Sequence, residues 1–141
     1  MPHLTLLFTP CVDRMVDMPA LCQDLADAMR AQVDEDGKPV FPIGGIRVLA
    51  FPAQYSAVAD GGSAGRKAGG SGDYGFIYLN LRMGRGRTPA THKKVGDALT
   101  VVAKSAFDKA LQNEHVGITL QIDVGPEVYD SKTSSLHPLF R

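Results

Sequence analysis

Three arginines lie close together near the middle of the chain, where a predicted strand leads into a predicted helix. They are Arg82, Arg85 and Arg87, within the segment 81–89. The first turn of a helix has N–H groups without backbone partners and carries the positive end of the helix dipole, so this junction favours anions. An arginine placed there can hold a carboxylate through two parallel hydrogen bonds. The alternative is a solvated basic loop, because most charged loops only keep a surface soluble.

Arg47 is a second candidate for anion binding, on a different predicted strand. The alternation of a strand over 46–51 places Arg47 on the same face as Leu49 and Phe51. An unpaired charge on a partly buried face is costly, so an arginine there either pairs with an acid or binds an anionic ligand. The pattern alone leaves both alternatives open.

Pro2 is a candidate base. Removal of Met1, which a small neighbour such as proline permits, would leave the proline nitrogen as a free secondary amine. An α-amino group ordinarily titrates at about 7.7–8.0. Burial in an apolar pocket beside cationic arginines would lower its pKa and leave it neutral near pH 7, as a general base for carbon acids requires. While Met1 is attached the nitrogen is an amide without basicity, and a proline at position 2 has no chemical role.

Other common sites are poorly supported. The segment 61–68 lacks the second glycine and the Ser or Thr after Lys that a phosphate-binding loop requires. The four histidines are scattered and none has a cysteine neighbour, so no metal site is expected. The alternation of glycine and arginine at 84–87 has no aromatic residues beside it and is only a weak signal for RNA binding.

The predicted elements form two copies of a strand–helix–strand unit, at about 2–52 and 74–124. Strands are expected over 2–9, 46–51, 74–83 and 117–124. Start signals for helices are Asp17 with Pro19 and Thr88 with Pro89. The first helix is expected to end near Gly37. The second has an apolar stripe of Val95, Leu99, Val102, Ala106 and Ala110.

These units predict one α+β (α/β-like) domain over 1–141, with a four-stranded mixed sheet and both helices on one face. The uncovered face is expected to be apolar and to mediate oligomerisation. A Gly-rich segment of about 59–73 is expected to be a flexible loop between the units. The extension 125–141 is expected to end in an apolar clasp of Leu136, Leu139 and Phe140.

The composition limits the possible partners. Of 141 residues, 15 are Lys or Arg and 15 are Asp or Glu, and zero net charge gives no general attraction to nucleic acid or to an anionic membrane. Cys11 and Cys22 show no pairing pattern, which favours a reducing, cytoplasmic location. The zero net charge results from two regions of opposite charge. Residues 1–36 include seven acidic residues and two arginines, whereas residues 74–96 include five basic residues and no acidic one.

Together these features resemble a known family. The segments that carry the resemblance are 1–4, 45–47, 73–76 and 84–88, in this order and spacing, with the tail 137–141. The chain resembles the tautomerase superfamily, and within it most closely the 5-carboxymethyl-2-hydroxymuconate isomerases. The resemblance implies a homotrimer whose sheets form a central barrel, with active sites near the subunit boundaries.

The resemblance also implies a reaction and a set of residues. Pro2 would be the catalytic base, while Arg47 and Arg87 match the two arginines that bind substrate carboxylates. The reaction would be a 1,3-proton shift, without cofactor or metal, that converts 5-carboxymethyl-2-hydroxymuconate to its 2-oxo-3-ene isomer in bacterial degradation of homoprotocatechuate. Arg82 and Arg85 have no assigned counterpart, and the Gly-rich segment is longer than expected.

Two alternatives remain at this point. The same proline and arginines would also suit hydration or dehalogenation of an unsaturated acid. From another functional class, a non-catalytic module could use the basic loop to bind an anionic metabolite or RNA.

Overall fold

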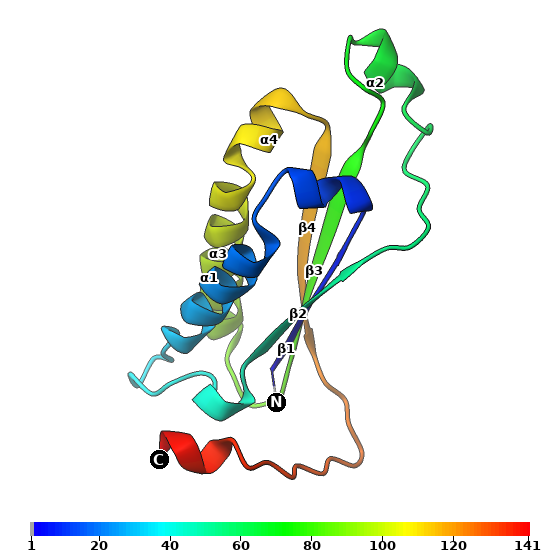
Figure 1. Cartoon of the computed structure of the whole chain (residues 1–141). Coiled ribbons are helices and arrows are strands. Elements are labelled where there is room, and N and C mark those ends of the chain that lie inside the picture. Colours follow the sequence, from blue (N-terminus) through cyan, green and yellow to red (C-terminus); the bar gives the residue numbers. More distant parts are fainter. Residues whose placement is uncertain (1) are drawn as a thin grey trace.

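The computed structural model describes residues 2–141, and Met1 lies outside the described residues. Its centre is one mixed sheet in the strand order β2-β1-β3-β4 (Figure 1). The strands are β1 (His3–Phe8), β2 (Arg47–Pro52), β3 (Gly75–Met83) and β4 (Val116–Val124). β1 is parallel to β2 and β3 is parallel to β4, while β1 and β3 run antiparallel at the centre. The predicted pair of strand–helix–strand units is confirmed.

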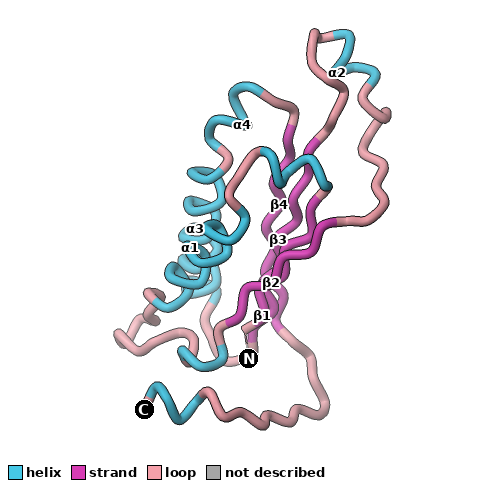
Figure 2. Tube along the Cα trace, viewed as in Figure 1, coloured by secondary structure: helices cyan, strands magenta, loops and turns pink. Residues whose placement is uncertain are grey.

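Two long helices, α1 (Met18–Arg30) and α3 (Pro89–Ala106), cover one face of the sheet (Figure 2). Both begin where the sequence predicts. The Asp17 carboxylate accepts from the N–H of Ala20 at 3.1 Å, and the Thr88 hydroxyl accepts from the N–H of Thr91 at 3.1 Å. Each cap satisfies a helix-terminal donor and contributes about 1 kcal/mol.

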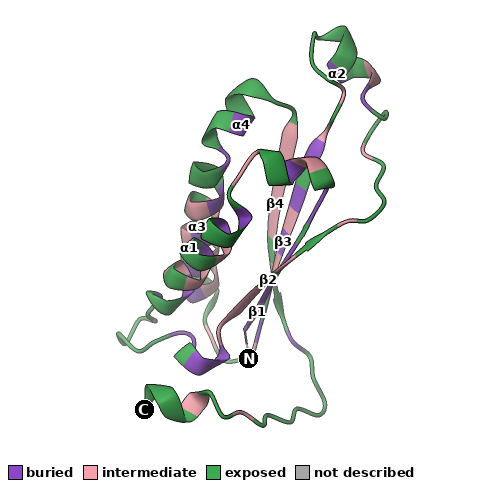
Figure 3. Cartoon of the chain, in the orientation of Figure 1, coloured by how far each residue is buried: buried purple, intermediate pink, exposed green. Residues whose placement is uncertain are grey.

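The core lies between this helix layer and the sheet (Figure 3). Alternate residues of the two central strands face it and are almost completely buried, as the period of a strand requires. They are Leu4, Leu6 and Phe8 of β1 and Ile77, Leu79, Leu81 and Met83 of β3. Full burial of each such side chain contributes roughly 1.5–3 kcal/mol, so this layer holds the ends of the central strands in place. Among residues 2–141 no helix is both long and apolar enough to cross a membrane.

The first helix ends earlier than predicted. α1 stops at Arg30, and the chain then makes a tight hairpin with a bridge between Val33 and Pro39. The Asp34 carboxylate accepts from the N–H groups of Asp36 and Lys38 at 2.9 and 3.0 Å. The positive φ of Gly37 (75°) therefore serves this turn rather than a helix end.

The second helix is interrupted. α3 ends at Ala106, and a separate short helix, α4 (Asp108–Asn113), follows. Phe107 between them is fully buried, which reorients the chain. The predicted stripe is right for Val95, Leu99 and Ala110, which are buried, and Val102 packs against the core. Ala106 is exposed, and Ala103 takes its place on the buried face.

The Gly-rich segment contains a short helix, α2 (Ser63–Lys67), where the sequence predicts a flexible loop. Asp60 and Tyr74 organise it. The Tyr74 hydroxyl donates to Asp60 Oδ1 at 2.8 Å and accepts from the N–H of Gly65 at 2.9 Å. The second carboxylate oxygen of Asp60 accepts from the N–H of Ala64 at 2.9 Å. We call residues 59–74 the α2 lobe; it lies beyond the end of β1 that is distant from Pro2 (Figure 1).

The open face of the sheet is apolar on one half only. Leu7, Leu49 and Phe51 on β1 and β2 are each about half exposed. On β3 and β4 this face carries polar pairs. Tyr78 donates to Gln121 at 2.9 Å, and Asn80 donates to the carboxylate of Asp123. The expectation of a wholly apolar face is therefore wrong for the β3–β4 half.

The C-terminal residues do not form the predicted apolar clasp. Leu136, Leu139 and Phe140 are each at least half exposed. The chain instead ends in a 3₁₀ turn, η3 (His137–Phe140), that packs on another, η2 (Ile43–Gly45). A Cβ on Gly44 would lie 3.0 Å from the His137 backbone. The close contact of η3 with η2 at Gly44, rather than burial of apolar side chains, holds the C-terminal residues in place.

Candidate active site

A cavity of about 550 Å³ opens at the end of the sheet where β1 begins and β3 ends. Buried Pro2, directly before β1, lines it. The remaining lining residues are Pro42, Gly84, Arg85, Arg87, Glu127, Asp130, Lys132 and His137. The cavity therefore combines the amino-terminal proline, the basic strand–helix junction and the C-terminal extension, which are far apart in the sequence.

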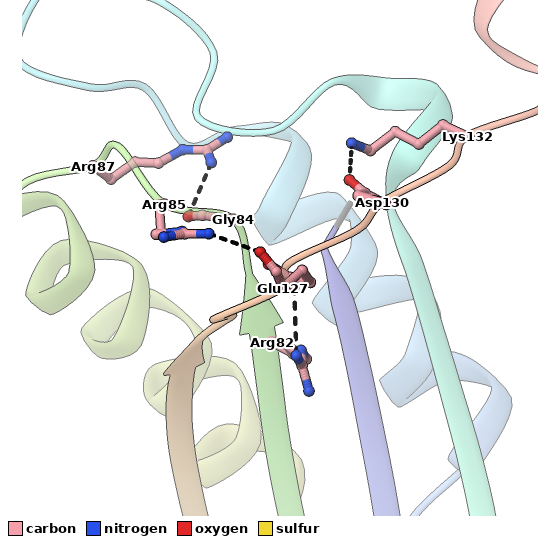
Figure 4. Close-up of polar contacts among 7 residues, drawn as sticks. All are labelled: Arg82, Gly84, Arg85, Arg87, Glu127, Asp130 and Lys132. Carbon is pink, nitrogen blue, oxygen red and sulfur yellow. Dashed lines mark hydrogen bonds and ion pairs between the residues drawn. The ribbon is translucent and has the colours of Figure 1, made fainter.

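Arg87 is held by backbone carbonyl groups. Its Nη2 donates to Val40 O at 2.5 Å. Its Nη1 donates to Gly84 O at 3.2 Å (Figure 4). The guanidinium is half-buried. An arginine has five N–H donors, so donors remain for an anion. Carbonyl oxygens fix its orientation without neutralising its charge.

The start of α3 is tied to the hairpin that precedes Val40. Glu35 Oε1 accepts from the hydroxyl of Thr91 at 3.1 Å and from the hydroxyl of Thr88. These hydrogen bonds, led by that from Thr88, lower the pKa of the Glu35 carboxyl. An ionised carboxylate at a helix start is also favoured by the helix dipole. The carbonyl that holds Arg87 and the helix that follows Arg87 are thereby connected.

Arg47 is the first residue of β2, on the open face of the sheet, and is not among the residues that line the cavity. His3 of β1 lies between two arginines on the neighbouring strands. Its partner on β2 is Arg47, and its partner on β3 is Arg82. Burial, together with the positive charges of Arg47 and Arg82, lowers the pKa of His3. The His3 ring is therefore neutral near pH 7, and the positive charge next to Pro2 belongs to the arginines.

The segment 125–136, which we call the C-terminal arm, forms one wall of the cavity (Figure 4). Glu127 attaches it: its carboxylate lies 3.5 Å from Arg82 Nη2, and its carbonyl accepts from Arg85 Nη2 at 2.9 Å. The pKa of Glu127 is lowered by its own backbone N–H and by Arg82. Further along, Lys132 Nζ donates to Asp130, which lowers the pKa of Asp130.

Pro2, Arg47 and Arg87 were predicted from the sequence, whereas the arm was not. The structure places Pro2 and Arg87 in one cavity, whereas Arg47 does not line it and lies opposite His3. Arg82 and Arg85, which had no assigned role, contact the arm. Glu127, Asp130 and Lys132 lie in a segment without a helix or strand pattern, so no local pattern singled them out in the sequence.

Two further cavities, each of about 520 Å³, lie next to the α2 lobe. Cys11 and Arg14 line one of them, and His115 lines the other. Arg14 is paired with Asp73 at 3.2 Å, so its charge is balanced within the chain. Within residues 2–141 no group of three or more metal-binding side chains comes together.

The cavity at Pro2 has the components of proton-transfer chemistry on an anionic compound. The nitrogen of buried Pro2 becomes an amine when Met1 is absent. Pro2 lines the same cavity as Arg87, whose guanidinium is held by backbone carbonyl groups. Fixed guanidinium groups stabilise an oxyanion in a reaction because they need no reorganisation as its charge develops.

Comparison with known proteins agrees with this chemistry. The sequence profile of the 5-carboxymethyl-2-hydroxymuconate isomerase family matches residues 2–140.

The chain belongs to this family. A solved 5-carboxymethyl-2-hydroxymuconate delta-isomerase is 55% identical and has a TM-score of 0.95, over 100% of this chain and 93% of that one. A 5-carboxymethyl-2-hydroxymuconate Delta-isomerase from Escherichia coli is 21% identical over 141 residues, 100% of both chains. The resemblance seen in the sequence is confirmed, and the chain is an isomerase.

The fold extends beyond this isomerase family. A fused 4-OT protein, solved as a symmetric trimer, is 16% identical and has a TM-score of 0.58, over 96% of this chain and 98% of that one. At this identity the likeness concerns the fold alone. The predicted tautomerase-like α+β fold is confirmed.

Proposed function

We propose that this isomerase moves a proton of 5-carboxymethyl-2-hydroxymuconate from the 2-hydroxyl oxygen to C5, with the amine of Pro2 as the base and without a cofactor. The observation that carries the proposal is the burial of Pro2 in a cavity that also holds Arg87. The named relatives, one of them 55% identical over the whole chain, support this substrate over hydration or dehalogenation of another unsaturated acid.

The proton moves from oxygen to carbon in two steps. The neutral amine first accepts the proton of the 2-hydroxyl group, and the negative charge spreads over the resulting dienolate. The protonated amine then returns a proton to carbon, which gives the 2-oxo-3-ene isomer. One O–H bond breaks and one C–H bond forms, so the reaction needs no oxidant or reductant.

Arg87 and Arg47 bind two carboxylates of the substrate and stabilise the dienolate. Arg87 suits this role because Val40 and Gly84 hold its guanidinium through carbonyl oxygens. Arg47 contributes from the neighbouring strand, opposite His3. Their positive charges also favour the neutral form of the proline amine, which is the form that accepts a proton.

We propose that the working enzyme is a cytoplasmic homotrimer in homoprotocatechuate degradation. The half-exposed cluster of Leu7, Leu49 and Phe51 on the open sheet face supports association. The fused 4-OT protein of the same fold is a trimer. Burial of this face between copies would remove its apolar side chains from water.

Pro2→Ala tests the base. Intact mass spectrometry first establishes that Met1 is absent from the wild-type sample, and ultraviolet absorbance then follows turnover of the dienol. Loss of a positioned general base lowers a rate by about 10²- to 10⁴-fold. We expect a fall in this range, with the oligomeric state unchanged.

Pro10→Ala is the matched control, since Pro10 is exposed at the opposite end of β1. We expect it to keep wild-type activity. Full activity of a sample whose mass shows that Met1 is retained would refute the assignment of the base, as would full activity of Pro2→Ala. Incorporation of water into the product, detected by proton NMR, would refute the isomerisation.

A further inference from the structure

The proposed substrate has three carboxylates, two on the muconate chain and one on the carboxymethyl group, whereas the two arginines assigned above account for two. We propose that Lys132, on the C-terminal arm, is a specificity-determining residue that binds the third carboxylate. This inference rests on the proposed function and assigns a role to a residue outside the proline and the two arginines.

Lys132 lies in the wall of the cavity that holds Pro2 and Arg87. The arm that carries it is attached at Glu127, through the ion pair with Arg82 at 3.5 Å and the hydrogen bond from Arg85 at 2.9 Å. Figure 4 shows these contacts next to the Lys132–Asp130 pair. Two arginines of the strand–helix junction therefore attach the arm at Glu127, and Lys132 follows on the same arm.

Lys132 is better suited to this role than Arg85. Arg85 contacts the carbonyl of Glu127 and serves to attach the arm. The Lys132 ammonium instead contacts a carboxylate, that of Asp130, and its side chain is 46% exposed. A partly exposed ammonium has three donors on a flexible stem, so a substrate carboxylate can replace or join Asp130 as its partner.

The test compares two dienols that differ in one carboxylate: 5-carboxymethyl-2-hydroxymuconate and 2-hydroxymuconate. We expect Lys132→Met to lower kcat/KM for the tricarboxylate roughly 10-fold or more, mainly through KM, because it removes a charge-assisted hydrogen bond. For the dicarboxylate we expect a change of less than about twofold. Lys132→Arg, which keeps the charge, should retain most of the selectivity.

Lys109→Met is the matched control, because Lys109 is exposed on α4. It should leave both substrates unaffected. An equal loss on both substrates with Lys132→Met, or no loss on either, would overturn the role of Lys132 while the proposed function stands. Failure of the wild-type enzyme to convert either dienol would overturn the proposed function and this inference with it.

Discussion

The two ends of the sheet treat charge in different ways. Next to the α2 lobe, Arg14 faces the carboxylate of Asp73, and Asp60 is held by the hydroxyl of Tyr74. At the Pro2 end, the contacts of Arg87 are with two carbonyl oxygens. The lobe end therefore balances the charge of Arg14 within the chain. The Pro2 end also pairs Arg82 and Lys132 with carboxylates, but it holds Arg87 through carbonyl oxygens, which leave the charge of Arg87 for a ligand. The exposed Arg14 and the half-buried Arg87 thus differ in whether a carboxylate or a carbonyl oxygen is their partner.

The largest expected difference between the two ends comes from the arginines. Loss of one donor to a developing oxyanion lowers the rate by about 10²- to 10³-fold. We expect Arg87→Ala to lower kcat/KM on dicarboxylate dienols in this range, and Arg47→Ala to act in the same direction. The loss should be smaller on monocarboxylate analogues, as measured by ultraviolet absorbance.

Arg14→Ala is the control at the lobe end, because it removes an arginine that is already paired with Asp73. Exposed pairs contribute at most about 1 kcal/mol, so both activity and stability should change little. Equal losses on dicarboxylates and monocarboxylates with Arg87→Ala would contradict a role in carboxylate binding, and a large loss with Arg14→Ala would remove the distinction between the two ends.

A smaller effect, on stability rather than activity, is expected at the lobe end. Tyr74→Phe removes a hydroxyl that donates to Asp60 and accepts from Gly65. We expect the free energy of unfolding, measured with urea, to fall by about 1–2 kcal/mol. Hydrogen exchange over 59–74 should accelerate, while kcat/KM stays within about twofold of the wild type, since local opening there does not reach the Pro2 cavity.

Tyr55→Phe is the matched control for this prediction, because Tyr55 is 86% exposed. Its unfolding free energy should equal that of the wild type. A loss of activity with Tyr74→Phe as large as the loss with Arg87→Ala would show that the two ends are coupled.

The smallest expected effect concerns His3 at the Pro2 end. Arg47→Gln removes one of the positive charges that lower the pKa of His3, so this pKa should rise toward its ordinary value. Burial is the larger cause and persists in the variant, so the pKa should stay below about 6.5. The titration of the His3 ring protons by NMR measures it.

The same pKa shift links stability to pH. As the pH falls through about 6.5 the unfolded chain takes up the proton at His3 before the folded chain does, so the folded state loses stability. Arg47→Gln should reduce this loss. An unchanged His3 pKa in the variant would mean that the charge of Arg47 does not act on the Pro2 end of β1.

Local signals account for what the sequence could predict. The alternation in β3 and the caps at Asp17 and Thr88 depend on near neighbours, so the strand faces and both helix starts were predictable. The interruption at Phe107 depends on a space in the core that the neighbouring residues do not reveal. The end of α1 was missed because Asp34 competes for backbone N–H groups.

For the candidate site, the family resemblance grouped Pro2 with Arg87, but the contribution of the C-terminal arm was not predictable. Pro2 and Arg87 stood out through position and local pattern. Lys132 did not, because its relevance depends on the path of an arm without regular structure. That path is set by contacts such as Arg85 with Glu127, which are 42 residues apart.

Pro2 and the C-terminal arm come from opposite ends of the chain and border the same cavity. During translation the cavity is therefore complete only after nearly all of the 141 residues have left the ribosome. The same arrangement affects affinity tags, since one fused ahead of Pro2 converts its nitrogen into an amide. A fluorophore or epitope is better placed in the α2 lobe.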